Sequence, residues 1–228
     1  MKNASLTICC CLLLSLTISA QSTDVERPDY RKIRKEIEQK KSSFYYPYLM
    51  QRFLVADSTL TLQEKRHLYY GYQFQAGYAP YASPKYIDHI LVILKKETQS
   101  INDIDRIIQL SDSILVKNPF SMQALNYQLY ALRLQKDENQ VQLRTTQIQI
   151  ILDALLSSGD GTTKKDAFYV IDPSHEYAII DAVGLQFRGA QYLVDHYDFL
   201  ELKENELGLK GLFFDVSPSL NHLNKIFP

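Results

Sequence analysis

The stretch ILVKNPFSMQAL, residues 114–125, decides the fold that we expect. A helical pattern of apolar residues reaches Leu115, and Pro119 then interrupts it, because proline disfavours helical backbone at the residue before it. The same proline suits the first turn of a second helix, whose apolar side continues to Leu125. We therefore predict two consecutive helices joined by a tight corner at Asn118-Pro119.

This corner resembles the joint between two tetratricopeptide repeats, in which an Asn-Pro or Asp-Pro pair ends one repeat. The resemblance covers about one and a half repeats. The small residue that the family places further into the first helix of a repeat is missing from the matching position. The resemblance implies helix pairs, which either stack as a short solenoid or close into a compact helical domain.

Helix signals continue in both directions, and residues 28–158 are predicted to form one all-α region of helix pairs. Thr61 and Glu64 have the spacing of a capping box, in which each side chain binds a free backbone N–H at the start of a helix. Gly159 is expected to end the last helix in the left-handed conformation. The other predicted helix starts are Pro28, Pro47, Ser83-Pro84, Asn102 or Asp103, Asn118-Pro119 and Asp137.

The pattern changes after residue 158, and residues 159–228 are predicted to form a small α+β module. Short apolar runs rich in aromatic and β-branched residues indicate strands, and their short connections favour antiparallel pairing. The predicted strands cover residues 167–171, 185–187, 191–194, 197–203 and 209–216, with helices opened by Asp172-Pro173 and Ser217-Pro218. The predicted fold class is therefore α+β, with an all-α helix-pair region before a small, mostly antiparallel module.

The first twenty residues have the pattern of a secretory signal peptide: Lys2, an uncharged apolar run over residues 6–18, and small residues up to Ala20. That run is shorter than the roughly 20 apolar residues that span a bilayer. We expect cleavage after Ala20, a loose segment over residues 21–27, and a periplasmic or secreted protein without a transmembrane segment. A lipoprotein is the lesser alternative, because the residues up to Cys9 loosely resemble a lipobox.

The composition excludes several classes of function. Hydrophobic residues are 46% and charged residues 22% of the chain, as in folded globular proteins. Lys and Arg number 25 against 26 Asp and Glu, so no net charge draws the chain to nucleic acid or anionic lipid. Cys9, Cys10 and Cys11 all fall within the signal peptide, so the exported chain has no thiol for catalysis or zinc binding. We expect no cofactor and no metal site.

A further resemblance rests on six segments spread along the chain, residues 28–33, 46–53, 67–72, 159–162, 174–177 and 197–201. They are similar to a family of exported proteins from Bacteroidetes-type bacteria that is defined only as a domain of unknown function. The resemblance covers nearly the whole mature chain and implies an exported single-chain protein. It brings no catalytic or binding residues to this sequence.

Two polar motifs could carry chemistry. His175-Glu176 begins like a zinc protease motif, but the residue four positions after the histidine is Ile179, so a second imidazole is missing. We expect this pair in the first turn of a helix, where the dipole favours Glu176. The second motif, residues 195–198 (DHYD), holds two carboxylates and an imidazole, and we expect a polar turn before a strand.

Tyrosine is the unusual residue of this chain, with 16 Tyr and no Trp. Nine of them fall between Tyr45 and Tyr86, and most are expected to fill gaps between helices. The segment Gly77–Ala82 is instead a predicted loop, stiffened because Pro80 restricts the residue before it. Stiff loops lose little entropy on binding, so we predict that Tyr78 and Tyr81 are at least partly exposed and contact a partner.

These features predict an exported, non-enzymatic binding or scaffold protein with a protein or peptide partner in the bacterial envelope. One alternative is a hydrolase of glycans or peptides that uses acids between Asp195 and Glu206; it requires converging acids in a deep pocket. The other is a carbohydrate-binding protein, which requires exposed Tyr rings.

Overall fold

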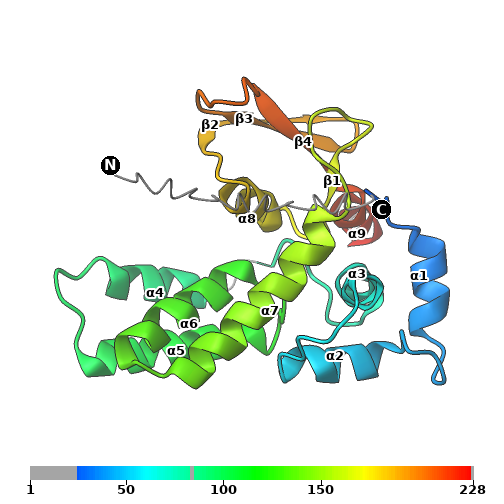
Figure 1. The fold of residues 1–228 in the computed structure, drawn as a ribbon. Helices are drawn as coiled ribbons and strands as arrows, with labels where there is room; N and C mark the ends of the chain where they lie inside the picture. Colours follow the sequence, from blue (N-terminus) through cyan, green and yellow to red (C-terminus); the bar gives the residue numbers. More distant parts are fainter. Residues whose placement is uncertain (1–24, 83–84, 227–228) are drawn as a thin grey trace, which may run out of the picture.

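The computed structural model describes residues 25–82 and 85–226, and its secondary structure confirms the α+β class (Figure 1). The predicted signal peptide, its cysteines and the Ser83-Pro84 helix start lie outside the described residues. Within the described part of the chain, no helix combines the length and the apolar character needed to cross a membrane.

The helical region is divided by its longest helix, α7 (Glu138–Leu156). In Figure 1 this helix runs diagonally between two groups, and it packs against α6 on one side and α3 on the other. The first group is α1 (Tyr30–Ile37), α2 (Tyr46–Leu54), α3 (Leu62–Gly71) and the short 3₁₀ helix η1 (Tyr72–Phe74). The second group is α4 (Tyr86–Leu94), α5 (Ile101–Leu115) and α6 (Met122–Gln135).

Local capping explains where these helices begin. The capping box of Thr61 and Glu64 is present as predicted, and Asp137 caps α7. The predicted cap of α5 at Asn102 or Asp103 is wrong. Ser100 caps the helix, and Asp103 is the acidic partner in a second capping box, because the carboxylate returns to the Ser100 backbone N–H.

Two positions that were predicted to start or end a helix, Pro119 and Gly159, differ from the prediction. The corner at Asn118-Pro119 is present, but α6 begins three residues later, because the Ser121 side chain accepts from the Ala124 N–H. Gly159 does not end α7 in a left-handed conformation. Glycine is needed there because a Cβ would stand 2.2 Å from the carbonyl oxygen of Ala167.

The module after α7 is a four-stranded sheet with two helices beneath it (Figure 1). Its strand order is β1-β4-β3-β2, antiparallel except for the parallel β1/β4 pair. The two strands predicted over residues 185–187 and 191–194 are one strand, broken by a bulge at Gly189, whose φ is +113°. The elements are β1 (Phe168–Tyr169), α8 (Ser174–Ala182), β2 (Phe187–Val194), β3 (Tyr197–Leu202), β4 (Gly211–Asp215) and α9 (Ser217–Ile226).

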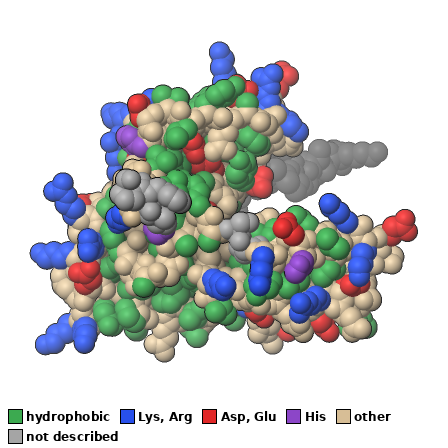
Figure 2. Space-filling model, turned by 180° about the vertical axis from the view of Figure 1, so that it is seen from behind, with side chains coloured by type: hydrophobic (Ala, Val, Ile, Leu, Met, Phe, Trp, Pro, Cys, Tyr) green, Lys and Arg blue, Asp and Glu red, His purple; other side chains and the backbone are tan. Residues whose placement is uncertain are grey.

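The larger hydrophobic core continues across residue 159. It joins Phe53, Tyr70 and Leu155 from the helices to Phe168 and Phe214 from the sheet. A second core fills the space between α4, α5 and α6. Seen from behind, the surface is notched between the sheet and the helices α4 to α6, and hydrophobic side chains lie along the notch (Figure 2).

Candidate binding site

The structure brings together the two features that the sequence analysis singled out, the Tyr-rich loop and the Asn-Pro corner. The loop (residues 75–82) connects η1 to α4, and the corner (residues 116–121) connects α5 to α6. Tyr72 joins them, because its hydroxyl lies 3.2 Å from the carbonyl oxygen of Gly77 and 3.0 Å from that of Lys117. Burial raises the pKa of Tyr72 to about 12, so the hydroxyl keeps the proton that it donates.

Loop and corner enclose a hollow of about 650 Å³, which we name the loop–corner hollow. This volume falls within the range of about 300 to 1,000 Å³ that is usual for ligand sites. Its walls are mostly apolar, and among the described lining residues the charged ones are Lys85 and Lys117. The lining residues are Tyr72, Gly77, Ala79, Ala82, Lys85, Tyr86, Ser113, Ile114, Val116, Lys117 and Asn118.

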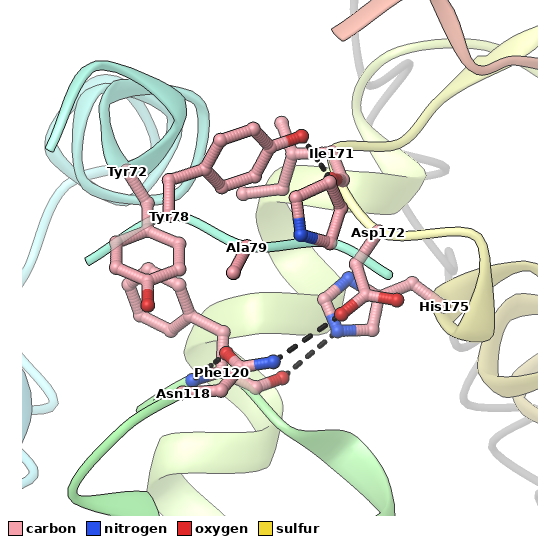
Figure 3. Close-up of a pocket in the computed structure, with 9 residues that line it drawn as sticks. Tyr72, Tyr78, Ala79, Asn118, Phe120, Ile171, Asp172 and His175 are labelled. Carbon is pink, nitrogen blue, oxygen red and sulfur yellow. Dashed lines mark hydrogen bonds between the residues drawn. The ribbon is translucent and has the colours of Figure 1, made fainter. Parts of the chain in front are cut away.

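Tyr78 is not exposed, and the prediction of its exposure is wrong. Only 6% of the residue is accessible, and its hydroxyl donates to the carbonyl oxygen of Ile171 at 2.5 Å. The ring meets Tyr72 and His222 edge-on, at centroid distances of 5.8 and 5.1 Å. The long-range hydrogen bond from Tyr78 to Ile171 sets which side of the loop faces the core (Figure 3).

Tyr81 is 45% accessible, which confirms the predicted exposure of this ring. Partial burial raises its pKa, and the acidic residues Asp198, Glu176 and Asp172 raise it further. A partner contact through Tyr81 stays a prediction.

The loop rests on a buried hydrogen-bond network at the start of α8 (Figure 3). The ring nitrogens of His175 lie 2.8 Å from the carbonyl oxygen of Phe120 and 2.7 Å from the hydroxyl of Tyr69. Because a carbonyl only accepts, Nε2 carries the proton and Nδ1 accepts from Tyr69. Burial lowers the pKa of His175, which keeps the imidazole neutral.

The same network connects the corner to α8. The Asn118 side-chain amide donates to Asp172 at 3.3 Å, and its oxygen accepts from the Phe120 N–H at 3.2 Å. A cavity of about 10 Å³ lies between these groups and Tyr78, close to the space that one water molecule needs. The network thus supports the loop and the corner that form the hollow.

Glu176 and Asp198 form a buried acid pair between α8 and β3. The amide nitrogen of Gln191 donates to both, at 3.2 Å to Glu176 and 2.9 Å to Asp198, and its oxygen accepts from Tyr177 at 2.8 Å. Glu176 is fully buried. Burial, followed by the charge of Asp198, raises the pKa of Glu176 to about 10, so its carboxyl group is neutral at pH 7.

The placement of Glu176 corrects the sequence prediction in one respect. The residue lies in the first turn of α8, as predicted, but its carboxyl is buried under Gln191 and protonated instead of charged beside the helix dipole. The sequence contained a signal for this burial in strand β3. Asp198 is two residues before the buried Leu200, and residues two apart on a strand share one face, so Asp198 also points inward.

The acid pair does not have the geometry of an accessible catalytic site in this arrangement. A general acid must come within hydrogen-bonding reach of its substrate, and the Glu176 carboxyl has no exposed surface. His196 lies in the turn before β3, 3.5 Å from Asp215. Among the described residues, no group of three or more His, Cys, Asp or Glu side chains is placed to hold a metal ion.

A family model described as a domain of unknown function, DUF4919, matches residues 31–225. The chain belongs to the DUF4919 family. The match confirms the predicted membership of a family of unknown function, whereas the Bacteroidetes origin and the tetratricopeptide likeness stay predictions. No curated protein and no solved structure matches this DUF4919 chain.

The sequence patterns did not indicate the two lysines that line the loop–corner hollow, Lys85 and Lys117. Lys117 directly precedes the Asn118-Pro119 corner, and Lys85 directly precedes α4. Lys117 lies within the stretch that the corner pattern marked, but only the folded loop shows that the two residues line one hollow.

Proposed function

We propose that this protein is an exported, non-enzymatic component of the bacterial envelope that binds a protein or peptide partner in the loop–corner hollow. The observation that carries the proposal is the meeting of the Tyr-rich loop and the helix-pair corner around one hollow of about 650 Å³. Helix-pair proteins of the repeat type commonly use concave surfaces of this kind for binding.

The rigid support of the hollow favours binding. Tyr72 fixes the loop to the corner, and the Asn118–Asp172 contact fixes the corner to α8. A site that is ordered before its partner arrives loses less conformational entropy on binding. Export is supported by the sequence alone, through the short apolar run that ends at Ala20.

Two exposed apolar residues at opposite ends of α5 provide a matched test. Val116 follows the last residue of α5, lines the hollow and is 85% accessible, whereas Ile101 is the first residue of α5 and is 80% accessible. Fifteen residues of helix separate these two ends by about 22 Å. Because both side chains are exposed, Val116→Asp and Ile101→Asp should each fold normally.

The readout is affinity capture from the native envelope, followed by mass spectrometry. The affinity of the Val116→Asp variant for the partner should fall by about tenfold or more, which corresponds to roughly 1.4 kcal/mol of binding free energy. The Ile101→Asp variant should capture as the parent does. Normal capture by Val116→Asp would contradict the hollow as the binding surface.

A hydrolase is the second candidate, favoured by the convergence of Glu176 and Asp198. It requires Gln191 to move, because this amide covers the pair. Hydrolysis of a peptide or glycan by the parent, abolished in an Asp198→Asn variant, would support it over the binding function. The carbohydrate-binding alternative rests on exposed rings such as Tyr81 and stays a prediction.

A further inference from the structure

This inference rests on the proposed function and concerns the chemistry of the partner. The loop–corner hollow carries positive charge at two places, Lys85 and Lys117. The ammonium group of Lys85 lies 5.3 Å from the ring centroid of Tyr86, a second lining residue, so the charge stands at the wall of the hollow. No Asp or Glu occurs among the described residues that line it.

The nearest acid in the sequence of α5 does not neutralise these lysines. The Asp112 carboxylate lies 2.5 Å from the amide nitrogen of Gln128 on α6 and 3.7 Å from the guanidinium of Arg144 on α7. It is therefore engaged with the helices behind α5. The molecule as a whole has a net charge of -1, so the positive charge of the hollow is a local feature.

The rest of the wall is apolar. Val116, which is 85% accessible, and the small side chains of Ala79 and Ala82 line it, above the buried Ile114 of the core between α4, α5 and α6. Walls of this kind offer little to a fully hydrated ion, but they contact apolar groups. Cationic and apolar surfaces in one hollow complement a partner that is both anionic and apolar.

We propose that the loop–corner hollow binds an apolar peptide segment that carries a carboxylate. Lys85 and Lys117 pair with the carboxylate, while Tyr86 and the exposed Val116 contact the apolar side chains. The carboxylate belongs either to an acidic side chain or to the carboxyl terminus of the peptide, and the chemistry of recognition is the same for both.

Four acetylated peptides distinguish the two sources. All share the segment Leu-Trp-Leu, followed by Glu or Gln, and each ends in a free carboxylate or an amide. Because the protein contains no Trp, the tryptophan fluorescence anisotropy of the peptide reports binding without background. The Gln-amide peptide, which has no carboxylate, is the matched neutral control.

The peptides with a carboxylate should bind at least about tenfold more tightly than the Gln-amide peptide, and the stronger single-carboxylate peptide identifies the source. The double variant Lys85→Glu with Lys117→Glu should lose that preference, and added salt should weaken it. The control variant Lys95→Glu changes an exposed lysine at the opposite end of α4 and should bind as the parent does.

Equal binding of all four peptides would overturn the inference, as would unchanged binding by the double lysine variant. Failure of every peptide to bind at concentrations on the order of 1 mM would overturn it too. None of these outcomes decides the proposed function, which the capture experiment with Val116→Asp judges separately. If the double lysine variant loses the preference for peptides with a carboxylate but still captures the envelope partner normally, the hollow binds that partner through its apolar wall alone.

Discussion

At the scale of single residues, Tyr78 fixes the loop on which the hollow depends. Its ring packs between Tyr72 and His222, and its hydroxyl reaches Ile171 at the start of the module. Tyr81, three residues later, is partly exposed, with 45% of the residue accessible. The two tyrosines therefore differ in energetic role although they share one loop.

Replacing Tyr78 with Ala should lower the free energy of unfolding by about 3 to 5 kcal/mol, because it removes a buried ring and one of the two hydrogen bonds to the Ile171 carbonyl oxygen, the other coming from the Ser219 hydroxyl. Tyr81→Ala should cost about 1 kcal/mol or less. Urea denaturation followed by circular dichroism measures both. Equal stability of the two variants would show that Tyr78 is not anchored as described.

The second prediction at this scale concerns Glu176 and pH. Its pKa is raised in the folded state to about 10, so the folded protein keeps a proton that the unfolded chain releases near pH 4.5. The stabilisation is complete below pH 4.5 and is lost as the pH rises toward 10. Glu176→Gln keeps the neutral form at every pH and should remove this loss.

Between pH 7 and 9 the parent should therefore lose stability relative to Glu176→Gln, by up to about 1.4 kcal/mol per pH unit. His175 does not disturb this window, because its lowered pKa affects stability only below its ordinary value of 6.5. Denaturant midpoints at several pH values give the two slopes. Parallel slopes would mean that the Glu176 carboxyl is charged in the folded protein.

Much of the candidate site could be predicted at the level of residues, but its arrangement could not. Local sequence marks the loop, its stiffness at Pro80 and the helical position of His175-Glu176. The burial of Tyr78 depends on Ile171, 93 residues away, and a local pattern contains no information on that contact. The burial of Glu176 likewise depends on Gln191 and Asp198, which arrive with the sheet.

At the scale of elements, the corner between α5 and α6 is joined to α8. The Asn118 side chain donates to Asp172 just before α8 and accepts from Phe120 just before α6. Asp172 is itself nearly buried, so the loss of this amide leaves a carboxylate oxygen short of a donor. The corner therefore holds α8 as well as turning the chain.

Asn118→Ala should lower the free energy of unfolding by about 1 to 2 kcal/mol. Asn102→Ala, on the exposed side of the first turn of α5, should change it by no more than about 0.5 kcal/mol. Thermal and urea unfolding of the two variants give the comparison. A corner that turns the chain without holding α8 would leave both variants as stable as the parent.

Elements with strong local signals were predictable because capping acts within one turn of helix. The Thr61–Glu64 box and the Asp137 cap are examples. Strand β2 was split in the prediction, since a bulge at Gly189 interrupts the alternation although the pairing with β3 resumes at Gln191. The parallel β1/β4 pair joins residues that are 46 positions apart in the chain, such as Phe168 and Phe214, and no local pattern specifies this pairing.

At the scale of the whole molecule, one hydrophobic core extends from the helices into the sheet. Phe53 and Leu155 belong to the same cluster as Phe168 and Phe214. The change from helices to sheet at Gly159 is a change of secondary structure within a continuous core. The division into two domains stays a prediction that unfolding can test.

We expect a single cooperative unfolding transition. The far-ultraviolet dichroism, which reports the helices, and the fluorescence of the tyrosines should change at the same urea concentration. The tyrosines report both regions, since Tyr70 lies in α3 and Tyr197 in β3. Two separated midpoints would show that residues 28–158 and 159–228 unfold as independent domains.

The central claim, that the loop–corner hollow is the partner-binding surface, is tested most directly by site-specific photo-crosslinking in the native envelope. A photoreactive amino acid at Val116 lies in the hollow, and one at Tyr192 lies on the exposed strand β2, where Tyr192, Leu193 and Val194 form another exposed apolar surface. We predict a defined crosslinked peptide or protein from position 116 and none from position 192. A crosslink from position 192 with none from position 116 would contradict the account and place the partner on the edge of the sheet.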